Sequence, residues 1–256
     1  MIKRIITALA IIACVIPPLV IGGYLLYALI ALVIIVGGFE LVNLLASRKF
    51  LSTPWLFLCF SIVVLAVLVP DKYSFSVLSI LILILMATPV FYKKMTSEDS
   101  FYVIASCCLL YMLGVSFLHI YNFNELYIWY LLLATYGCDT GAYFAGSLFG
   151  KTKLIPSISP KKTVEGAIGG WVVGALLSLL FALFIIKDMN MLLMILGCLW
   201  LPITSQIGDL SFSAIKRHFH VKDFSNIFPG HGGFMDRIDS LVFNLIVLSS
   251  FMVLVL

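Results

Sequence analysis

The sequence predicts an all-α, polytopic integral membrane protein with about nine transmembrane helices. This prediction follows from the hydrophobicity of the chain, the length of its apolar runs and the one-sided distribution of Lys and Arg. Hydrophobic residues make up 62% of the 256 residues and charged residues only 11%, whereas about a quarter of a soluble domain is charged. The net charge of +4 is too small to indicate nucleic-acid binding, so we expect no nucleic-acid partner.

The apolar runs set the expected number of membrane crossings, since a helix needs about 20 apolar residues to cross the hydrocarbon core. The first two runs are joined only by Gly22 and Gly23, and the eighth is long enough to extend beyond the bilayer. The runs lie near residues 5–22, 24–46, 54–70, 74–92, 101–120, 126–148, 164–186, 191–215 and 233–256.

The basic residues predict the sidedness of these crossings, because cytoplasmic loops collect Lys and Arg. With the N-terminus in the cytoplasm, only Lys72 and Lys187 of the 16 Lys and Arg residues fall on the outer side. One missed crossing would invert every loop after it, so this distribution supports the count. The C-terminus is then expected outside.

Polar residues are concentrated in the second half of the chain. Residues 1–125 contain few buried charges, of which Glu40 is the clearest, and we expect them to form a transmembrane scaffold of about five helices. Residues 126–256 are expected to form a catalytic region of about four helices with cytoplasmic loops at 149–163 and 216–233.

An aspartate lies well inside the sixth apolar run. Asp139 is flanked at intervals of four by Gly137, Gly141 and Ala145, which form a small-residue face suited to close helix packing. We expect Asp139 to face a polar cavity, because a charged group at membrane depth is costly and usually functional. The alternative is a helix-pairing carboxylate satisfied by Thr140 or a neighbouring helix.

An anion site is predicted where the following loop meets the seventh apolar run. Thr163 is suited to cap a helix, Glu165 falls in its first turn, and Gly166, Gly170 and Gly174 would form a close-packing face. The helix N-terminus and the basic residues before it would attract the same anion. These residues are Lys151, Lys153, Lys161 and Lys162, which could instead mark topology or anchor anionic headgroups.

A second polar cluster begins in the eighth run. Asp209, Ser213 and Arg217 recur every four residues with Lys216 beside them, so one helix face runs from a buried carboxylate to a cation pair. A Gly-rich turn then leads to Asp236. That turn contains His231, which we interpret as a hydrogen-bond donor to a phosphate or as a proton carrier.

The carboxylates of this cluster indicate a metal site. Asp209, Asp236 and Asp239 come from two helices, and oxygen ligands in small number suit Mg²⁺ completed by substrate phosphates. Structural ion pairs with Lys216, Arg217 and Arg237 are the alternative. Carboxylates, cations and a Gly-rich turn at the cytoplasmic rim together indicate phosphoryl or nucleotidyl transfer to a lipid.

The charged motifs resemble those of the phosphatidate cytidylyltransferases, or CDP-diacylglycerol synthases. The passage from Ser213 to Asp239 resembles the family signature, and similarity extends to the DTGAY passage at Asp139, to residues 159–166 and to Gly208-Asp209-Leu210. The signature positions are Ser213, Lys216-Arg217, Lys222-Asp223, His231-Gly232-Gly233, Asp236-Arg237 and Asp239. The resemblance covers roughly residues 130–245.

This resemblance implies that CTP and phosphatidate are converted to CDP-diacylglycerol and pyrophosphate. Asp209 and Asp236 would bind Mg²⁺, while Asp239 and Asp139 would support a second cation, which could be K⁺. The implied catalytic residues are Asp209, Asp236, Asp239, Lys216, Arg217 and Lys222. From the anion-site argument and the resemblance together, we expect substrate binding by Asp139, Lys151, Lys153, Ser159, Lys161, Lys162, Thr163, Glu165, Ser213, Asp223, His231, Gly232, Gly233 and Arg237.

The resemblance also implies an all-helical homodimer. We expect it to lie among membrane lipids in the bacterial inner (cytoplasmic) membrane, with the active site on the cytoplasmic side that the Lys and Arg residues indicate. Two alternatives stay open. A related membrane enzyme could act on another lipid phosphate or a polyprenol. An ion-coupled transporter could use Asp139 and Asp209 as ion ligands, although the chain lacks clear inverted repeats or broken helices.

Overall fold

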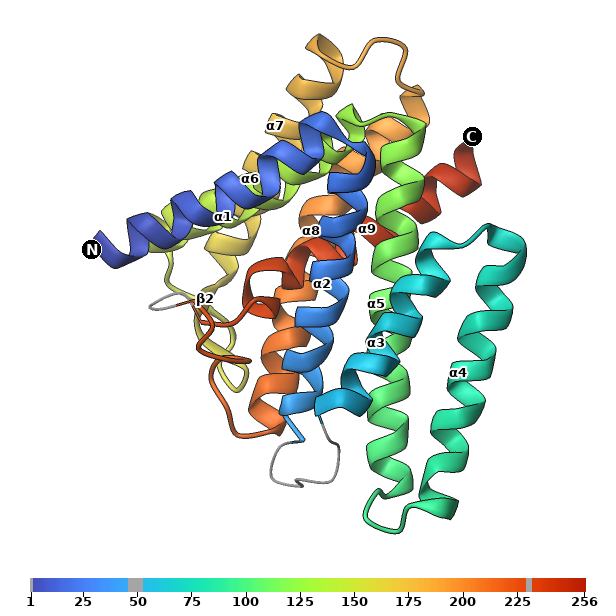
Figure 1. Ribbon diagram of the computed structural model, residues 1–256. Helices are drawn as coiled ribbons and strands as arrows, with labels where there is room; N and C mark the ends of the chain where they lie inside the picture. The colour runs from blue at the N-terminus through green and yellow to red at the C-terminus, as the bar shows by residue number, and fades with distance from the viewer. Residues whose placement is uncertain (1, 46–52, 229–231) are drawn as a thin grey trace. The chain divides into compact units, whose positions relative to one another are not determined.

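The computed structural model describes residues 2–45, 53–228 and 232–256. Within these ranges it contains nine helices and one two-stranded sheet (Figure 1). The helices are α1 (Ile2–Ile21), α2 (Gly23–Asn43), α3 (Thr53–Leu68), α4 (Asp71–Phe91), α5 (Ser97–Phe123), α6 (Leu126–Phe149), α7 (Val164–Phe184), α8 (Met191–His218) and α9 (Met235–Val255); the strands are β1 (Lys153–Ile155) and β2 (Ser159–Thr163). The predicted helical, polytopic architecture is confirmed.

Six of these helices are long and apolar enough to cross a membrane: α2, α4, α5, α7, α8 and α9. Helix α3 is shorter, with 16 residues, and α6, which is rich in Tyr and Gly, does not fall in this group among the described residues. Six crossings therefore have support from length and composition. The full count of nine crossings stays a prediction.

The structure departs from the expected loop at residues 149–163, where β1 and β2 pair in an antiparallel hairpin. The sequence did not predict this hairpin, because its strands have only three and five residues and the segment contains two prolines. Such short strands show no clear alternation of polar and apolar residues. The hairpin nevertheless pairs backbone N–H and C=O groups of the segment between α6 and α7.

The chain forms two compact units. One unit contains residues 1–115 and 223–236, and the other contains residues 116–222 and 237–256. In the first unit α3 packs against both α2 and α4, and in the second unit α6 packs against both α7 and α8. The segment 223–236 thus packs with the N-terminal helices, whereas the functional division expected at residue 125 stays a prediction.

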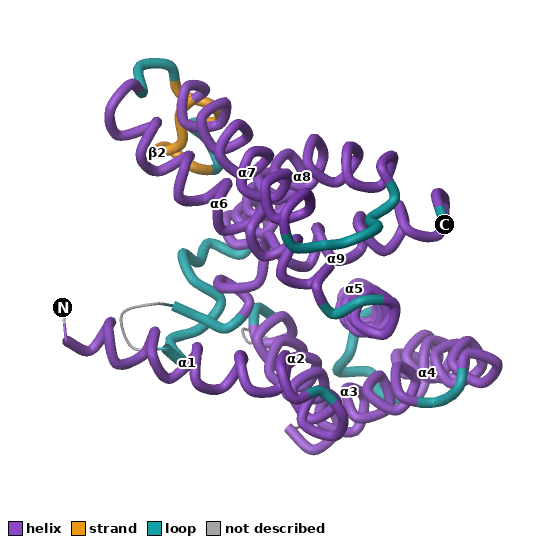
Figure 2. The backbone as a smooth tube through the Cα atoms, turned by 90° about the horizontal axis from the view of Figure 1, so that it is seen from above, coloured by secondary structure: helices purple, strands orange, loops and turns teal. Residues whose placement is uncertain are grey.

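Helices α6 and α7 approach closely along the predicted glycine face (Figure 2). A Cβ atom added to Gly170 would lie 2.6 Å from the carbonyl oxygen of Cys138, and one added to Gly174 would lie 2.6 Å from that of Ala134. The expectation of close packing is confirmed, since any side chain at these positions would push the helices apart.

A buried amide links three helices of the second unit. Asn244 of α9 is fully buried, donates to the Thr135 hydroxyl of α6 over 2.7 Å and accepts from the Thr204 hydroxyl of α8 over 2.5 Å. Polar side chains inside a membrane protein commonly link helices in this way. The link fixes α6, α8 and α9 in the unit that carries the candidate site.

Candidate active site

The β1–β2 hairpin delivers a basic segment to the N-terminus of α7. Lys153 lies opposite Thr163, and Ile155 lies opposite Ser159. The Val164 N–H donates to the carbonyl of Thr152 over 2.9 Å, which ties the first residue of α7 to the hairpin. Figure 2 shows this hairpin at one end of the α6–α7 pair. Lys161 and Lys162 therefore lie directly before the helix.

The predicted N-cap of α7 is confirmed. The Thr163 hydroxyl accepts a hydrogen bond from the Gly166 N–H over 3.1 Å. The Glu165 carboxylate turns back to accept from the N–H groups of Lys151 and Thr152, both over 3.1 Å. Glu165 thus holds the start of the hairpin, while its expected contact with substrate stays a prediction.

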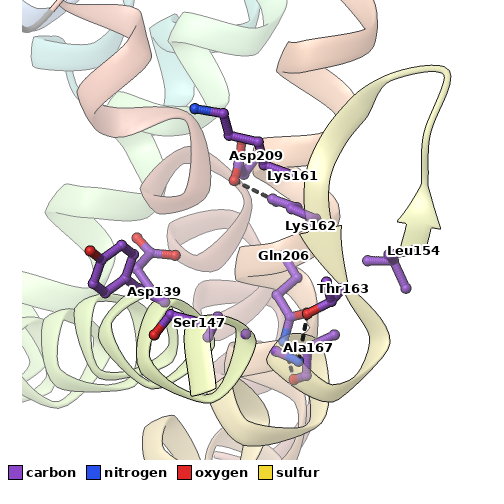
Figure 3. A pocket seen from close by; sticks show the side chains of 13 residues that line it. Asp139, Ser147, Leu154, Lys161, Lys162, Thr163, Ala167, Gln206 and Asp209 are labelled. Carbon is purple, nitrogen blue, oxygen red and sulfur yellow. Dashed lines mark hydrogen bonds and ion pairs between the residues drawn. The ribbon is translucent and has the colours of Figure 1, made fainter. Parts of the chain in front are cut away.

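A cavity of about 410 Å³ lies between the hairpin and three helices (Figure 3). Asp139 faces it from α6, Lys161 and Lys162 from β2, and Asp209 from α8. The other lining residues are Ala142, Tyr143, Gly146, Ser147, Leu154, Thr163, Gly166, Ala167 and Gln206. The position of Asp139 favours a cavity-facing carboxylate over a helix-pairing one.

An ion pair crosses this cavity. The Lys162 Nζ atom lies 2.5 Å from the Asp209 Oδ2 atom, and the two side chains are 28% and 32% exposed. The Ser213 hydroxyl, one turn further along α8, donates to the other Asp209 oxygen over 3.3 Å. Asp209 therefore holds an ammonium group at the edge of a solvent-accessible cavity.

Three carboxylates from different helices lie within electrostatic reach of one another. Asp139 of α6 and Asp239 of α9 each interact with Asp209 of α8, and Asp239 also interacts with Asp139. Lys162 and Lys216 supply nearby positive charge to this group. Because like charges repel, this arrangement favours positive charge beside the carboxylates.

The two basic residues at the end of α8 are held differently. Lys216 is buried, with 7% exposure. Arg217 is exposed and donates to two backbone carbonyls, that of Ile158 over 3.3 Å and that of Val221 over 2.9 Å. Arg217 therefore connects the hairpin turn to the end of α8, and its catalytic role stays a prediction.

The loop before α9 belongs to the first unit. The Asp236 Oδ2 atom accepts from the N–H groups of Phe224 and Gly233, both over 2.9 Å. Gly232 has a φ of 83°, a left-handed conformation that favours glycine. Asp236 therefore joins two N–H groups of the preceding loop to the first turn of α9. Its pairing with Asp209 in a metal site stays a prediction.

The remaining predicted site residues are spread over both units. His231 lies outside the described residues. Lys151, Lys153, Lys222, Asp223 and Arg237 are exposed, while Ser159 and Ser213 are half-buried. The structure brings Asp139, Lys161, Lys162, Thr163 and Asp209 to the cavity, and the roles of the others stay predictions.

Sequence reasoning missed one polar residue of the cavity and the partners of one buried acid. The Gln206 amide lines the cavity and donates to the Ala167 carbonyl of α7 over 3.0 Å. Its position three residues before Asp209, inside an apolar run, was the available signal. Glu40 stood out as a buried charge, but nothing in the sequence indicated that it binds the start of α9.

The donor set near Asp209 suits a hard divalent cation. Carboxylate oxygens are the ligands that Mg²⁺ prefers, and it commonly uses one or two of them together with water and substrate phosphates. Across residues 2–45, 53–228 and 232–256, no group of three or more His, Cys, Asp or Glu side chains is arranged to hold a metal ion. A cation bound here would thus take part of its coordination from substrate or water.

Comparison with known proteins gives consistent matches along the chain. The profile of the cytidylyltransferase family matches residues 2–255. The phosphatidate cytidylyltransferase of Staphylococcus epidermidis is 35% identical over 252 residues, which cover 96% of each chain. That of Staphylococcus haemolyticus is 34% identical over 254 residues with the same coverage. That of Bacillus subtilis is 36% identical over 189 residues, or 69% of this chain and 70% of the relative.

Proposed function

We propose that this chain, which belongs to the cytidylyltransferase family, transfers the cytidylyl group of CTP to phosphatidate. The products are CDP-diacylglycerol and pyrophosphate, and the step belongs to phospholipid biosynthesis. Relatives that carry the name phosphatidate cytidylyltransferase match 96% of the chain. The observation that carries the proposal is the cavity where Lys162 and Asp209 meet at the N-terminus of α7.

The basic wall of the cavity suits the phosphates of a nucleotide. Lys161 and Lys162 lie beside the first turn of α7, where the positive end of the helix dipole attracts anions. Lys162 lies against a carboxylate on the cavity wall, so its ammonium would bind a phosphate placed in the same cavity. These groups would offset the charge that develops on the leaving pyrophosphate.

An adjoining apolar groove suits the lipid. A depression of about 330 Å³ shares Leu154, Ala167 and Gln206 with the polar cavity. Its wall is otherwise apolar and includes Trp171 and Leu210. A molecule with a phosphate headgroup and acyl chains could place the headgroup in the polar cavity and a chain along this groove, which supports a phospholipid substrate over a soluble one.

The reaction requires positioning more than proton transfer. A phosphate oxygen of phosphatidate attacks the α-phosphorus of CTP, a new P–O–P bond forms, and the bond to the β-phosphate breaks to release pyrophosphate. The attacking phosphate is already ionised at neutral pH, so this chain need not supply a general base. Its residues instead orient two anions and neutralise their repulsion.

Metal binding is assigned to the carboxylates. We assign Asp209 and Asp236 to Mg²⁺, and Asp239 with Asp139 to a second cation such as K⁺. Bound Mg²⁺ would polarise the phosphates and neutralise charge in the transition state. The electrostatic proximity of Asp139, Asp209 and Asp239 supports part of this assignment, while the role of Asp236 rests on the signature motif alone.

We also propose a membrane orientation and an oligomeric state for the protein. The distribution of Lys and Arg supports an N-terminus and active site in the cytoplasm with the C-terminus outside. The family resemblance supports a homodimer in the inner membrane, which the mass of the detergent-solubilised protein would test.

Labelled CTP tests the reaction. Purified protein with phosphatidate, Mg²⁺ and CTP labelled at the α-phosphate should give a labelled lipid, whereas label at the γ-phosphate should appear in pyrophosphate. Lipid labelled from the γ-phosphate would instead identify a kinase-type phosphoryl transfer. Absence of any labelled lipid with active relatives assayed in parallel would refute the proposed function.

A further inference from the structure

Glu40 of α2 is a buried acidic residue for which the reaction described above has no use. Its side chain is 1% exposed and lies beside the buried Leu41 and Val42. A charged or polar group buried among apolar side chains is costly unless hydrogen bonds compensate it. The partners of Glu40 therefore indicate why it is there.

These partners lie almost 200 positions away, at the start of α9. The Glu40 carboxylate accepts from the Phe234 N–H over 2.7 Å and from the Met235 N–H over 2.6 Å. It also accepts from the Ser225 hydroxyl. The first N–H groups of a helix have no partner within the helix, so Glu40 satisfies and orients the N-terminus of α9 from a different helix.

A second carboxylate holds the same loop from the other side. Asp236 accepts from the N–H groups of Phe224 and Gly233, and Gly233 lies between the two acids. A Cβ atom added to Gly233 would lie 2.8 Å from the Glu40 Oε1 atom, so no larger residue fits there without displacing Glu40. The Asp236 carboxylate thus holds the N–H of Gly233, and the Glu40 carboxylate holds the N–H groups of the next two residues, Phe234 and Met235.

We propose that Glu40 is a positioning residue for the reaction, which fixes Ser225, Phe234 and the first turn of α9 so that Asp236 is presented in its working orientation. This inference rests on the proposed function, in which Asp236 binds a cation. Without the Glu40 carboxylate, two N–H groups at the start of α9 lose their acceptor. Asp236 is the acidic residue in the first turn of that helix, and competition for it would disturb its use as a ligand.

The test compares Glu40→Gln with a matched control in the same unit. Asp99 is equally buried at 1% exposure and accepts from the N–H and hydroxyl of Thr96 at the start of α5. We expect Glu40→Gln to lower kcat by about tenfold or more and to raise the half-saturating Mg²⁺ concentration by a similar factor, as outer-shell changes commonly do. Asp99→Asn should lower the melting temperature but leave both kinetic quantities unchanged.

Hydrogen exchange gives a readout that does not depend on turnover. Peptides covering residues 224–235 should exchange faster in Glu40→Gln than in the unmodified protein, and Glu40→Asp, which keeps the charge, should recover part of the protection and of kcat. If Glu40→Gln does not fold, Ser225→Ala removes one donor and should still raise the Mg²⁺ requirement.

Unchanged kcat and Mg²⁺ dependence in a folded Glu40→Gln protein would overturn the inference, even if its melting temperature fell. The same result in Ser225→Ala would overturn it where Glu40→Gln cannot be purified. An inactive unmodified protein would refute the proposed function instead, and the exchange comparison would still report whether Glu40 holds the loop.

Discussion

Replacing Lys162 with methionine should reduce turnover much more than stability. Lys162→Met removes the ammonium group but keeps most of the apolar stem, so the packing around β2 should survive. The substitution leaves the Asp209 carboxylate without the partner that lies 2.5 Å from it. It also removes the cation that we assign to a substrate phosphate.

The cost in stability follows from the geometry and exposure of the pair. At the observed 2.5 Å, the gross Coulombic attraction is about 1.7 kcal/mol at a dielectric constant of 80 and about 6.6 kcal/mol at 20. Both side chains keep roughly 30% exposure, so desolvation and side-chain entropy offset most of it and leave about 1 kcal/mol. The melting temperature should fall by about 2–4 °C.

The cost in turnover should be larger because a charged hydrogen bond to phosphate is lost. Such a bond contributes about 1.5–3 kcal/mol, which corresponds to a fall of about 10-fold to 150-fold in kcat/KM for CTP. The assay measures kcat/KM in mixed micelles of detergent and phosphatidate, and thermal unfolding is followed in parallel. Lys187→Met, at an exposed lysine of the same unit that does not line the cavity, is the control.

Equal kcat/KM for CTP in the Lys162→Met and unmodified proteins, together with a lower melting temperature, would refute this reasoning. Lys162 would then serve only to neutralise Asp209. The phosphate-binding wall would have to be assigned to other cations.

Three further predictions concern the scaffold of the site and its sidedness. Thr163→Ala removes the helix cap of α7 and should destabilise the protein by about 1 kcal/mol, whereas Thr163→Ser should not; equal melting temperatures would argue against the cap. Gly170→Ala forces a Cβ atom to within 2.6 Å of the Cys138 carbonyl, so it should lower both the melting temperature and activity; an unaffected variant would contradict the close packing of α6 and α7. Single cysteines placed at Lys161 and Lys72 in a cysteine-free background should react with an impermeant thiol reagent, the first from the inside and the second from the outside. Reaction of both from the same side would contradict the proposed topology.

The fold was predictable because membrane insertion imposes strong local rules on a sequence. Apolar runs and the placement of basic residues predicted the helices, and the spacing of Gly166, Gly170 and Gly174 predicted the face that packs on α6. The cap at Thr163 was predictable because the residues that form a helix cap lie within four positions of one another. Each of these patterns is contained in one short segment.

The features that could not be predicted depend on partners far apart in the chain. Helical periodicity placed Asp209 on a polar face but did not reveal that Lys162 of the hairpin would meet it. The hairpin itself is too short to give a strand pattern. Glu40 was visible as a buried charge, yet its partners at Phe234 and Met235 become apparent only once the helices are packed.

The central claim is that the Asp209 cavity carries out cytidylyl transfer, and Asp209→Asn tests it most directly. The substitution keeps the size of the side chain but removes the charge that holds Lys162 and would hold Mg²⁺. Transfer of α-labelled CTP into lipid should be Mg²⁺-dependent in the unmodified protein and should fall by about 100-fold or more in the variant, with a melting temperature within a few degrees. Full, Mg²⁺-dependent transfer by a folded Asp209→Asn protein would place the chemistry elsewhere in the chain and contradict the claim.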